Sequence, residues 1–301
     1  MKFSVFTAST PDWTPEEAVT ALSAQGWDGI EWRVTDQADA TPAGFWAGNK
    51  ANVPLTGLEE NVERIGRITR AAGLEFSGIG GYARCDNHAD VERMLAATAA
   101  LGARQVRVTV PPLGTAAWGA EEPSGTPYPV LFENARRDFA WVAERAAHHG
   151  VKALVELHHR TITASASSAR RLLEGLDPQH VGVIHDLGNL LIEGHEDYLP
   201  AFELLGDYLA HIHVKNAIWV RRDETDESGA AVWVNEWAPL QSGQGSVLAY
   251  FKALAAYGYD GWVTVEDFST ALPLEDRTAG NLAYLHRAAA LAGLATGAAV
   301  R

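Results

Sequence analysis

Hydrophobic and polar positions along the chain repeat in one order: an Ala-rich amphipathic stretch, a glycine, and then a short run of β-branched and aliphatic residues. The order recurs in residues 24–31, 71–76, 100–108, 148–156 and 256–266. Glycine suits the left-handed conformation that follows a helix C-terminus, and the next strand begins a few residues later. Repeated helix–glycine–strand units predict a parallel sheet covered by helices.

Eight short apolar runs are expected to be strands. They lie near residues 2–7, 28–33, 74–79, 105–110, 151–156, 181–186, 210–215 and 262–266. Helices are expected between them, for example over residues 15–25, 58–72, 90–101 and 134–149. Eight βα units in 301 residues predict a (β/α)8 TIM barrel, with residues 1–301 forming a single domain. A doubly wound open sheet is the competing fold, but no Gly-x-Gly-x-x-Gly turn follows the first strand.

Three connections are longer than the usual loops of α/β units. They cover residues 34–56 after strand 2, 111–128 after strand 4 and 217–245 after strand 7. Each follows a strand and precedes a helix, so in a barrel all three lie on the catalytic face. Their aromatic residues suit stacking against sugar rings, although a long insertion can also bury such residues as a small core of its own. These residues are Phe45, Trp46, Trp118, Trp219, Trp233 and Trp237.

The composition limits the class of protein. A hydrophobic content of 47% with 21% charged residues fits a soluble globular protein, and the formal net charge of −14 argues against binding to a nucleic-acid backbone. Cys85 is the single cysteine, which excludes an internal disulfide and fits a reducing compartment. The N-terminus is expected to be a strand and not a signal peptide. The sequence contains no run of 18 apolar residues, so no membrane span is expected. We therefore expect a cytoplasmic enzyme.

Four ionisable residues stand where predicted strands end: Glu156, Asp186, His213 and Glu266. A single acid at such a place is more often a cap or part of an ion pair. Four of them on successive strands would meet at one edge of the sheet, and three carboxylates with one imidazole suit Mn²⁺, Mg²⁺ or Co²⁺. Alternate residues of a strand point inward. His211 therefore lies deeper on the same line as His213, and strand pattern alone leaves both as candidate ligands.

Further polar residues cluster at the same strand ends: Glu31, Arg33, His158, His159, His185, Asn189, Lys215 and Asn216. His158 is a candidate to bind a substrate hydroxyl or transfer a proton, or to orient a metal ligand. Lys215 is a candidate to neutralise an enolate oxygen, or to form an ion pair with Glu156 or Glu266. Glu31 suits either a functional role or a structural carboxylate of the barrel.

These motifs resemble the xylose isomerase-like barrel superfamily, in its sugar phosphate isomerase/epimerase group, and the resemblance covers nearly the whole chain. The motifs are Glu156-Leu-His158, His185-Asp-Leu-Gly-Asn189, His211-Ile-His-Val-Lys-Asn216 and Val265-Glu-Asp267. The resemblance implies one metal ion, most commonly Mn²⁺, held by Glu156, Asp186, His213 and Glu266. It selects His213 over His211, and it makes the two glutamates an acid/base pair on opposite faces of a sugar.

The activity that the resemblance implies is proton abstraction next to a carbonyl, which gives an epimer or an isomer through an enediolate. His158 and Lys215 join the two glutamates as expected catalytic residues. The expected substrate-binding residues are Glu31, Asn189, Trp118, Trp219 and Arg222. The expected partner is a small sugar or glycoside, with no nucleic acid and no membrane, and the protein is expected to form a homo-oligomer.

The chain departs from the epimerase pattern in two places. Epimerases of the group follow the strand-7 histidine with Gly-Glu and an arginine, whereas this chain has Val214-Lys215-Asn216, and residues 217–245 also differ. A related branch, the C-glycoside deglycosidases, uses the same first step to eliminate an aglycone from 3-oxo-glycosides and works with a small second subunit. Endonuclease IV, another member of the superfamily, cleaves DNA with three metals. The acidic net charge of this chain argues against such a function. The remaining alternative is a non-catalytic barrel whose acids serve only stability or partner binding. A test of metal binding would distinguish this barrel from an enzyme.

Overall fold

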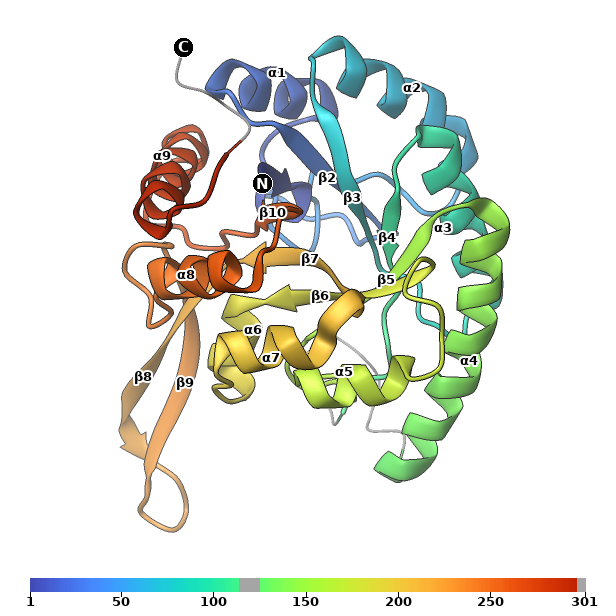
Figure 1. Ribbon diagram of the computed structural model, residues 1–301. Coiled ribbons are helices and arrows are strands. Elements are labelled where there is room, and N and C mark those ends of the chain that lie inside the picture. Colours follow the sequence, from blue (N-terminus) through green and yellow to red (C-terminus); the bar gives the residue numbers. More distant parts are fainter. Residues whose placement is uncertain (114–124, 297–301) are drawn as a thin grey trace.

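The computed structural model describes residues 1–113 and 125–296, and within them eight parallel strands close into a barrel (Figure 1). The strands are β1 (Lys2–Phe6), β2 (Gly29–Val34), β3 (Glu75–Gly81), β4 (Gln105–Arg107), β5 (Lys152–Glu156), β6 (Val181–Asp186), β7 (Leu209–Val214) and β10 (Trp262–Val265). Their order around the barrel is β1-β10-β7-β6-β5-β4-β3-β2. The predicted (β/α)8 barrel is confirmed, and the doubly wound open sheet is excluded.

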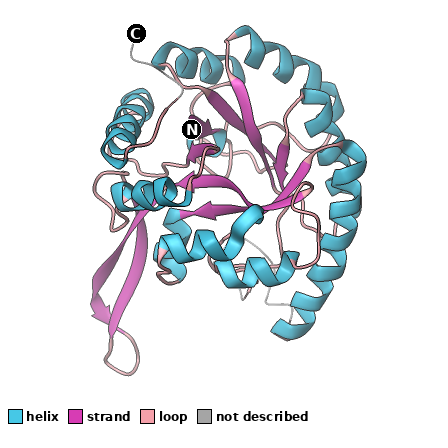
Figure 2. Cartoon of the chain, viewed as in Figure 1, coloured by secondary structure: helices cyan, strands magenta, loops and turns pink. Residues whose placement is uncertain are grey.

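Helices surround the barrel, as Figure 2 shows. They are α1 (Pro15–Gln25), α2 (Leu58–Ala71), α3 (His88–Leu101), α4 (Tyr128–His149), α5 (Ala166–Leu173), α6 (Leu187–Glu193), α7 (Tyr198–Leu205), α8 (Val247–Tyr257) and α9 (Leu274–Ala292), with 3-10 turns η1 (Thr7–Ser9) and η2 (Gly206–Tyr208). Helix α3 begins two residues before the predicted start because the Asn87 side chain accepts the Asp90 N–H and caps it. Helix α4 begins six residues earlier than predicted, with a proline in its first turn, where no intrahelical donor is needed.

The predicted long connection after strand 7 contains a β-hairpin. Its strands, β8 (Asn216–Thr225) and β9 (Ala231–Ala238), pair antiparallel and extend away from the barrel beside α6 (Figure 1). Side chains alternate between the two faces of such a ribbon. The pairing puts Trp219 opposite Asn235 and Arg221 opposite Trp233, and both tryptophans are exposed. Periodicity missed this hairpin because its outer half carries charged residues on both faces.

The hydrophobic core lies between the strands and the covering helices. Its largest fully buried side chains include Trp32, Tyr250, Phe139 and Phe202. Inside the barrel the side chains become polar toward the strand ends, beginning with Ser4, whose hydroxyl is 2.6 Å from that of Thr264 on the neighbouring β10. Among the described residues, no helix combines the length and apolarity needed to cross a bilayer.

Cys85 is buried, and this placement gives a testable prediction about its reactivity. Burial, with Asp138 and Asp86 adding to it, raises the pKa of the Cys85 thiol to about 12. Only the thiolate is nucleophilic, so we expect no reaction of the native protein with a disulfide reagent at mildly alkaline pH and full labelling after unfolding in urea. Rapid labelling of the native protein would show that this part of the β3–α3 connection opens.

Candidate active site

Strands β5, β6, β7 and β10 bring the four predicted ligands together at their carboxyl ends. Asp186 and His213 are register partners on adjacent strands, Glu156 is the last residue of β5, and Glu266 follows β10 directly. One ligand atom from each of the four lies within 4.8 Å of the others. All four are buried, with exposed fractions of 5% or less. The geometry is therefore a compact set of three carboxylates and one imidazole.

His213 occupies the centre of this set. Its Nε2 lies 3.0 Å from Glu31 Oε2. Its Nδ1 lies 3.3 Å from Glu266, 3.5 Å from Glu156 and 3.8 Å from Asp186, and no group of the described residues forms a hydrogen bond with it. Burial opposes a charge on this imidazole, but Glu31 and Glu266 hold the pKa of His213 well above its ordinary value. The carboxylates thus favour a positive charge at Nδ1, and a divalent cation fits this donor set.

His211 lies deeper in the barrel, and both of its ring nitrogens have protein partners. Its Nδ1 is 2.7 Å from Gln105 Nε2, and its Nε2 is 3.0 Å from Glu31 and 2.8 Å from Thr264. Glu31 Oε2 therefore bridges the two histidines beneath the carboxylates and does not line the pocket. Burial opposes ionisation of Glu31, but the two imidazoles hold its pKa below the ordinary value. This position fits orienting a ligand and not the substrate contact expected from the sequence.

Arg107 and Asn189 fix the carboxylate of Glu156. Arg107 Nη1 donates to Glu156 Oε2 at 2.5 Å, and Asn189 Nδ2 donates to Oε1 at 3.1 Å. Burial opposes ionisation, but Arg107 and Lys215 hold the pKa of Glu156 well below its ordinary value. Asn189 therefore holds the Glu156 carboxylate through a hydrogen bond, and it does not line the pocket.

Lys215 joins the remaining acids. Its Nζ lies 2.5 Å from Glu266 Oε2 and 2.9 Å from Asp186 Oδ2. Burial opposes ionisation of Glu266, but Lys215 and His213 lower its pKa to about 2. Burial raises the pKa of Asp186 to about 7 against the pull of Lys215. Gly188 permits this arrangement, because an added Cβ there would lie 2.3 Å from the Lys215 Cγ.

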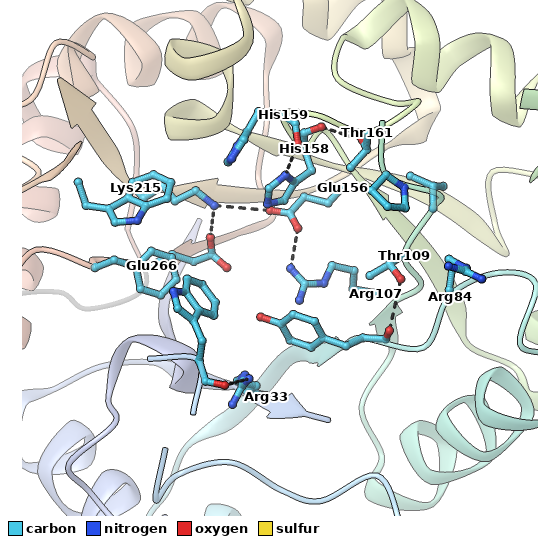
Figure 3. A pocket seen from close by; sticks show the side chains of 16 residues that line it. Arg33, Arg84, Arg107, Thr109, Glu156, His158, His159, Thr161, Lys215 and Glu266 are labelled. Atoms are coloured by element: carbon cyan, nitrogen blue, oxygen red, sulfur yellow. Dashed lines mark hydrogen bonds and ion pairs between the residues drawn. The ribbon is translucent and has the colours of Figure 1, made fainter. Parts of the chain in front are cut away.

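A cavity of about 770 Å³ opens above these residues (Figure 3). It is lined by Arg33, Trp46, Tyr82, Arg84, Arg107, Thr109, Val110, Pro112, Glu156, His158, His159, Thr161, Lys215, Trp237, Glu266 and Phe268. Aromatic rings face a floor of carboxylates and cations, a combination suited to a polar ring with apolar faces. Of the two glutamates and the aspartate in the ligand set, only the glutamates reach the pocket.

His158 also reaches the pocket. Its Nδ1 is 2.9 Å from the carbonyl oxygen of His159, and the two rings lie with centroids 4.4 Å apart. Burial lowers the pKa of His158 to about 3, although Glu156 opposes the change. The imidazole is therefore neutral at physiological pH. A neutral imidazole can bind a substrate hydroxyl and can accept a proton from it.

Two of the aromatic and basic residues predicted to bind substrate lie away from the pocket. The indole N–H of Trp219 donates to the carbonyl of Leu191 on α6 at 2.8 Å. Arg222 is on the exposed hairpin, 2.8 Å from Glu236. Both side chains lie on the hairpin, away from the cavity. Of the three tryptophans in the connection after strand 7, only Trp237 lines the cavity. Trp118 lies outside the described residues.

Sequence reasoning missed Arg107, Tyr82 and Phe268. Arg107 had a detectable signal, because it is a charge between two buried valines of a short strand, 96% buried with its Nη1 on Glu156. A charge at such a position needs a buried partner. Tyr82 and Phe268 follow β3 and β10 in irregular segments, where periodicity gives no orientation.

Over residues 19–288 the chain matches the family described as xylose isomerase-like TIM barrel. The chain belongs to this family. The membership predicted from the strand-end motifs is thereby confirmed, and the family match covers every residue of the candidate metal set.

Curated relatives include the inosose dehydratases of two lactic acid bacteria. That of Lacticaseibacillus casei is 28% identical over 141 residues, which cover 44% of this chain and 47% of the relative. That of Lactiplantibacillus plantarum is 30% identical over 142 residues, covering 44% and 46%. The chain spans about half the length of the curated relatives it matches.

Solved structures share the fold over almost the entire chain. The 3-keto-D-glucoside 4-epimerase of E. coli superposes with a TM-score of 0.69 at 19% identity, covering 95% of this chain and 99% of its own. A probable 3-DHS dehydratase from Bacillus anthracis gives a TM-score of 0.66 at 18% identity, with the same coverage of both chains. At these identities the similarity establishes the barrel architecture.

Proposed function

We propose that the protein is a divalent-metal-dependent epimerase that acts on a polyhydroxylated ketone, a sugar or cyclitol, by removing the proton from the carbon next to the carbonyl. The observation that carries the proposal is the pair of buried glutamates, Glu156 and Glu266, which both line the cavity and flank His213. The proposal agrees with the names of similar proteins, among them a 3-keto-D-glucoside 4-epimerase and inosose dehydratases.

The metal would be held by Glu156, Asp186, His213 and Glu266, with Mn²⁺ as the first candidate and Mg²⁺ or Co²⁺ as the others. When bound, it would supply Lewis acidity to the substrate carbonyl. His213 fits this role because Glu31 takes its Nε2 and leaves Nδ1 facing three carboxylates.

The two glutamates then divide the proton transfers. Both are anionic, because Arg107, Lys215 and His213 outweigh the effect of burial on their pKa values. One carboxylate takes the α-proton and leaves an enediolate. The other takes up a proton from solvent and passes it to the opposite face of the same carbon, and the first then releases its proton to solvent. The Lys215 ammonium lies 2.5 Å from Glu266 and neutralises negative charge that develops beside it.

Elimination is the second candidate function, and the inosose dehydratase relatives favour it. It shares the first step. The proton taken by a glutamate then passes to a hydroxyl on the next carbon, the C–O bond breaks, a C=C bond forms and water leaves. In a 3-oxo-glycoside the leaving group is an aglycone, and a small second subunit could complete such a site.

Proton exchange in D₂O, followed by NMR on the Mn²⁺-loaded protein, tests the proposal. The substrates are free ketoses, keto-cyclitols, 3-oxo-glycosides and polyhydroxylated keto acids. Exchange at the α-carbon with a new stereoisomer supports the epimerase, and exchange with loss of water or of an aglycone supports elimination. Absence of exchange with every class, in protein shown to hold the metal, counts against both. EDTA treatment is the matched control and is expected to stop the exchange.

A further inference from the structure

Among the described residues, the cavity contains one basic side chain that neither proton transfer nor an ion pair accounts for. Four basic side chains line it: Arg33, Arg84, Arg107 and Lys215. Three of them have a carboxylate partner, with Arg84 at 2.6 Å from Asp86, Arg107 at 2.5 Å from Glu156 and Lys215 at 2.5 Å from Glu266. Arg33 differs, because no carboxylate of the described residues forms an ion pair with it.

The hydrogen bonds of Arg33 all go to neutral oxygens. Nη1 donates to the side-chain carbonyls of Gln37 at 2.6 Å and Asn52 at 3.1 Å, and Nη2 donates to the backbone carbonyl of Trp46 at 3.4 Å. The residue is only 3% exposed, and its Nε makes no hydrogen bond within the described part of the chain. A buried charge without a counter-charge is costly. Its retention at a cavity wall indicates that a ligand supplies the counter-charge.

Arg33 stands on the opposite side of the cavity from Glu156 (Figure 3). The Tyr82 ring lies beside both guanidinium groups, with its centroid 5.2 Å from Arg33 Cζ and 4.4 Å from Arg107 Cζ. A ligand held by Arg33 at one end can therefore present another carbon to the glutamates. The hydrogen bonds to Gln37, Asn52 and Trp46 fix the guanidinium, so little side-chain entropy is lost on binding.

We propose that Arg33 recognises a carboxylate on the substrate, which makes the substrate class polyhydroxylated keto acids. This inference rests on the proposed function, since it takes the ketone from there. A carboxylate fits better than a phosphate because one surplus positive charge balances one negative charge. Phosphate sites of this barrel type also lie in the loops after strands 7 and 8, whereas Arg33 is on β2.

Calorimetric titration with D-glucuronate and D-glucose tests the proposal. These probes differ by a carboxylate in place of a hydroxymethyl group, and the titration reads binding without turnover. We expect glucuronate to bind about tenfold more tightly, as a charge-assisted hydrogen bond implies. The preference should persist in EDTA, which excludes direct binding of the carboxylate to a metal.

Variants locate the effect. Arg33→Gln should remove the preference, Arg33→Lys should keep part of it because the charge remains, and Arg222→Gln, on the exposed hairpin, should leave it unchanged. Circular dichroism establishes that each variant is folded. Equal binding of the two sugars to the wild type, no binding of glucuronate, or a preference that survives in folded Arg33→Gln would each overturn the proposal.

D-glucose 6-phosphate is the third probe. Tighter binding of this phosphate than of glucuronate would overturn the assignment of a carboxylate. Failure of these titrations leaves the proton-exchange result untouched, and failure of exchange leaves the binding preference untouched. The two proposals are therefore separable.

Discussion

Glu266→Gln is expected to lower the rate at which the epimer forms by about 10³-fold, within the range that a positioned acid or base contributes. Glutamine keeps the shape and one carbonyl oxygen of the side chain but cannot accept the proton. Glu156→Gln should have an effect of similar size, since both glutamates are buried, anionic and exposed to the same cavity. The measurement is formation of the deuterated epimer in D₂O, followed by NMR, on folded protein whose metal content has been determined.

The matched control is Glu236→Gln, which removes a carboxylate of the exposed hairpin that pairs with Arg222. We expect wild-type epimer formation from this variant. Epimer formation within tenfold of wild type in either Glu156→Gln or Glu266→Gln would contradict the two-carboxylate mechanism. A large loss in only one of them would identify that residue as the base of an elimination, because epimerisation needs both.

Mn²⁺ is expected to raise the thermal midpoint of unfolding by about 5 °C when its concentration is some hundredfold above the dissociation constant. His213→Gln should lose this shift, because the imidazole that faces three carboxylates is gone. His211→Gln should lower the midpoint of the metal-free protein, since it breaks hydrogen bonds to Gln105, Glu31 and Thr264, yet it should keep the shift. Differential scanning calorimetry with and without Mn²⁺ measures both effects.

The pair of histidine variants decides which imidazole binds the metal. Retention of the shift in His213→Gln, with its loss in His211→Gln, would place the metal deeper, at Glu31 and His211. No shift in the wild type, together with no bound metal by elemental analysis, would remove the metal from the proposed function.

The strand-end residues could be read from the sequence because the information is local. An apolar run followed by Glu156 or Asp186 shows both a buried strand and a polar end, whatever the strand packs against. Arg33 was noticed in the same way, but its lack of a carboxylate partner could not be. That property depends on which side chains of β3, β4 and the β2–α2 connection surround it, and these lie apart in sequence.

The hairpin formed by β8 and β9 shows side-chain positions that the sequence did not predict. The aromatic residues after strand 7 predicted contacts with a sugar. Pairing of β8 with β9 instead places the Trp219 indole against α6 and Arg222 in solvent. Of the tryptophans in this hairpin, only Trp237 lines the cavity. Alternation along the strands decides this outcome, and charged residues on both faces conceal the alternation in the sequence.

The sequence by itself determined the barrel, the order of its elements and the acids that end its strands, because hydrophobic periodicity and turn residues act over a few neighbours. Only the tertiary structure decided depth and pairing. Barrel closure sets β10 beside β1 and places Glu31 under His213 and His211, so that one histidine faces the carboxylates and the other is enclosed. The same closure gives Arg107 and Lys215 their carboxylates and leaves Arg33 without one among residues 1–113 and 125–296. Charge partners are fixed by distances across the barrel, and no local sequence pattern contains these distances.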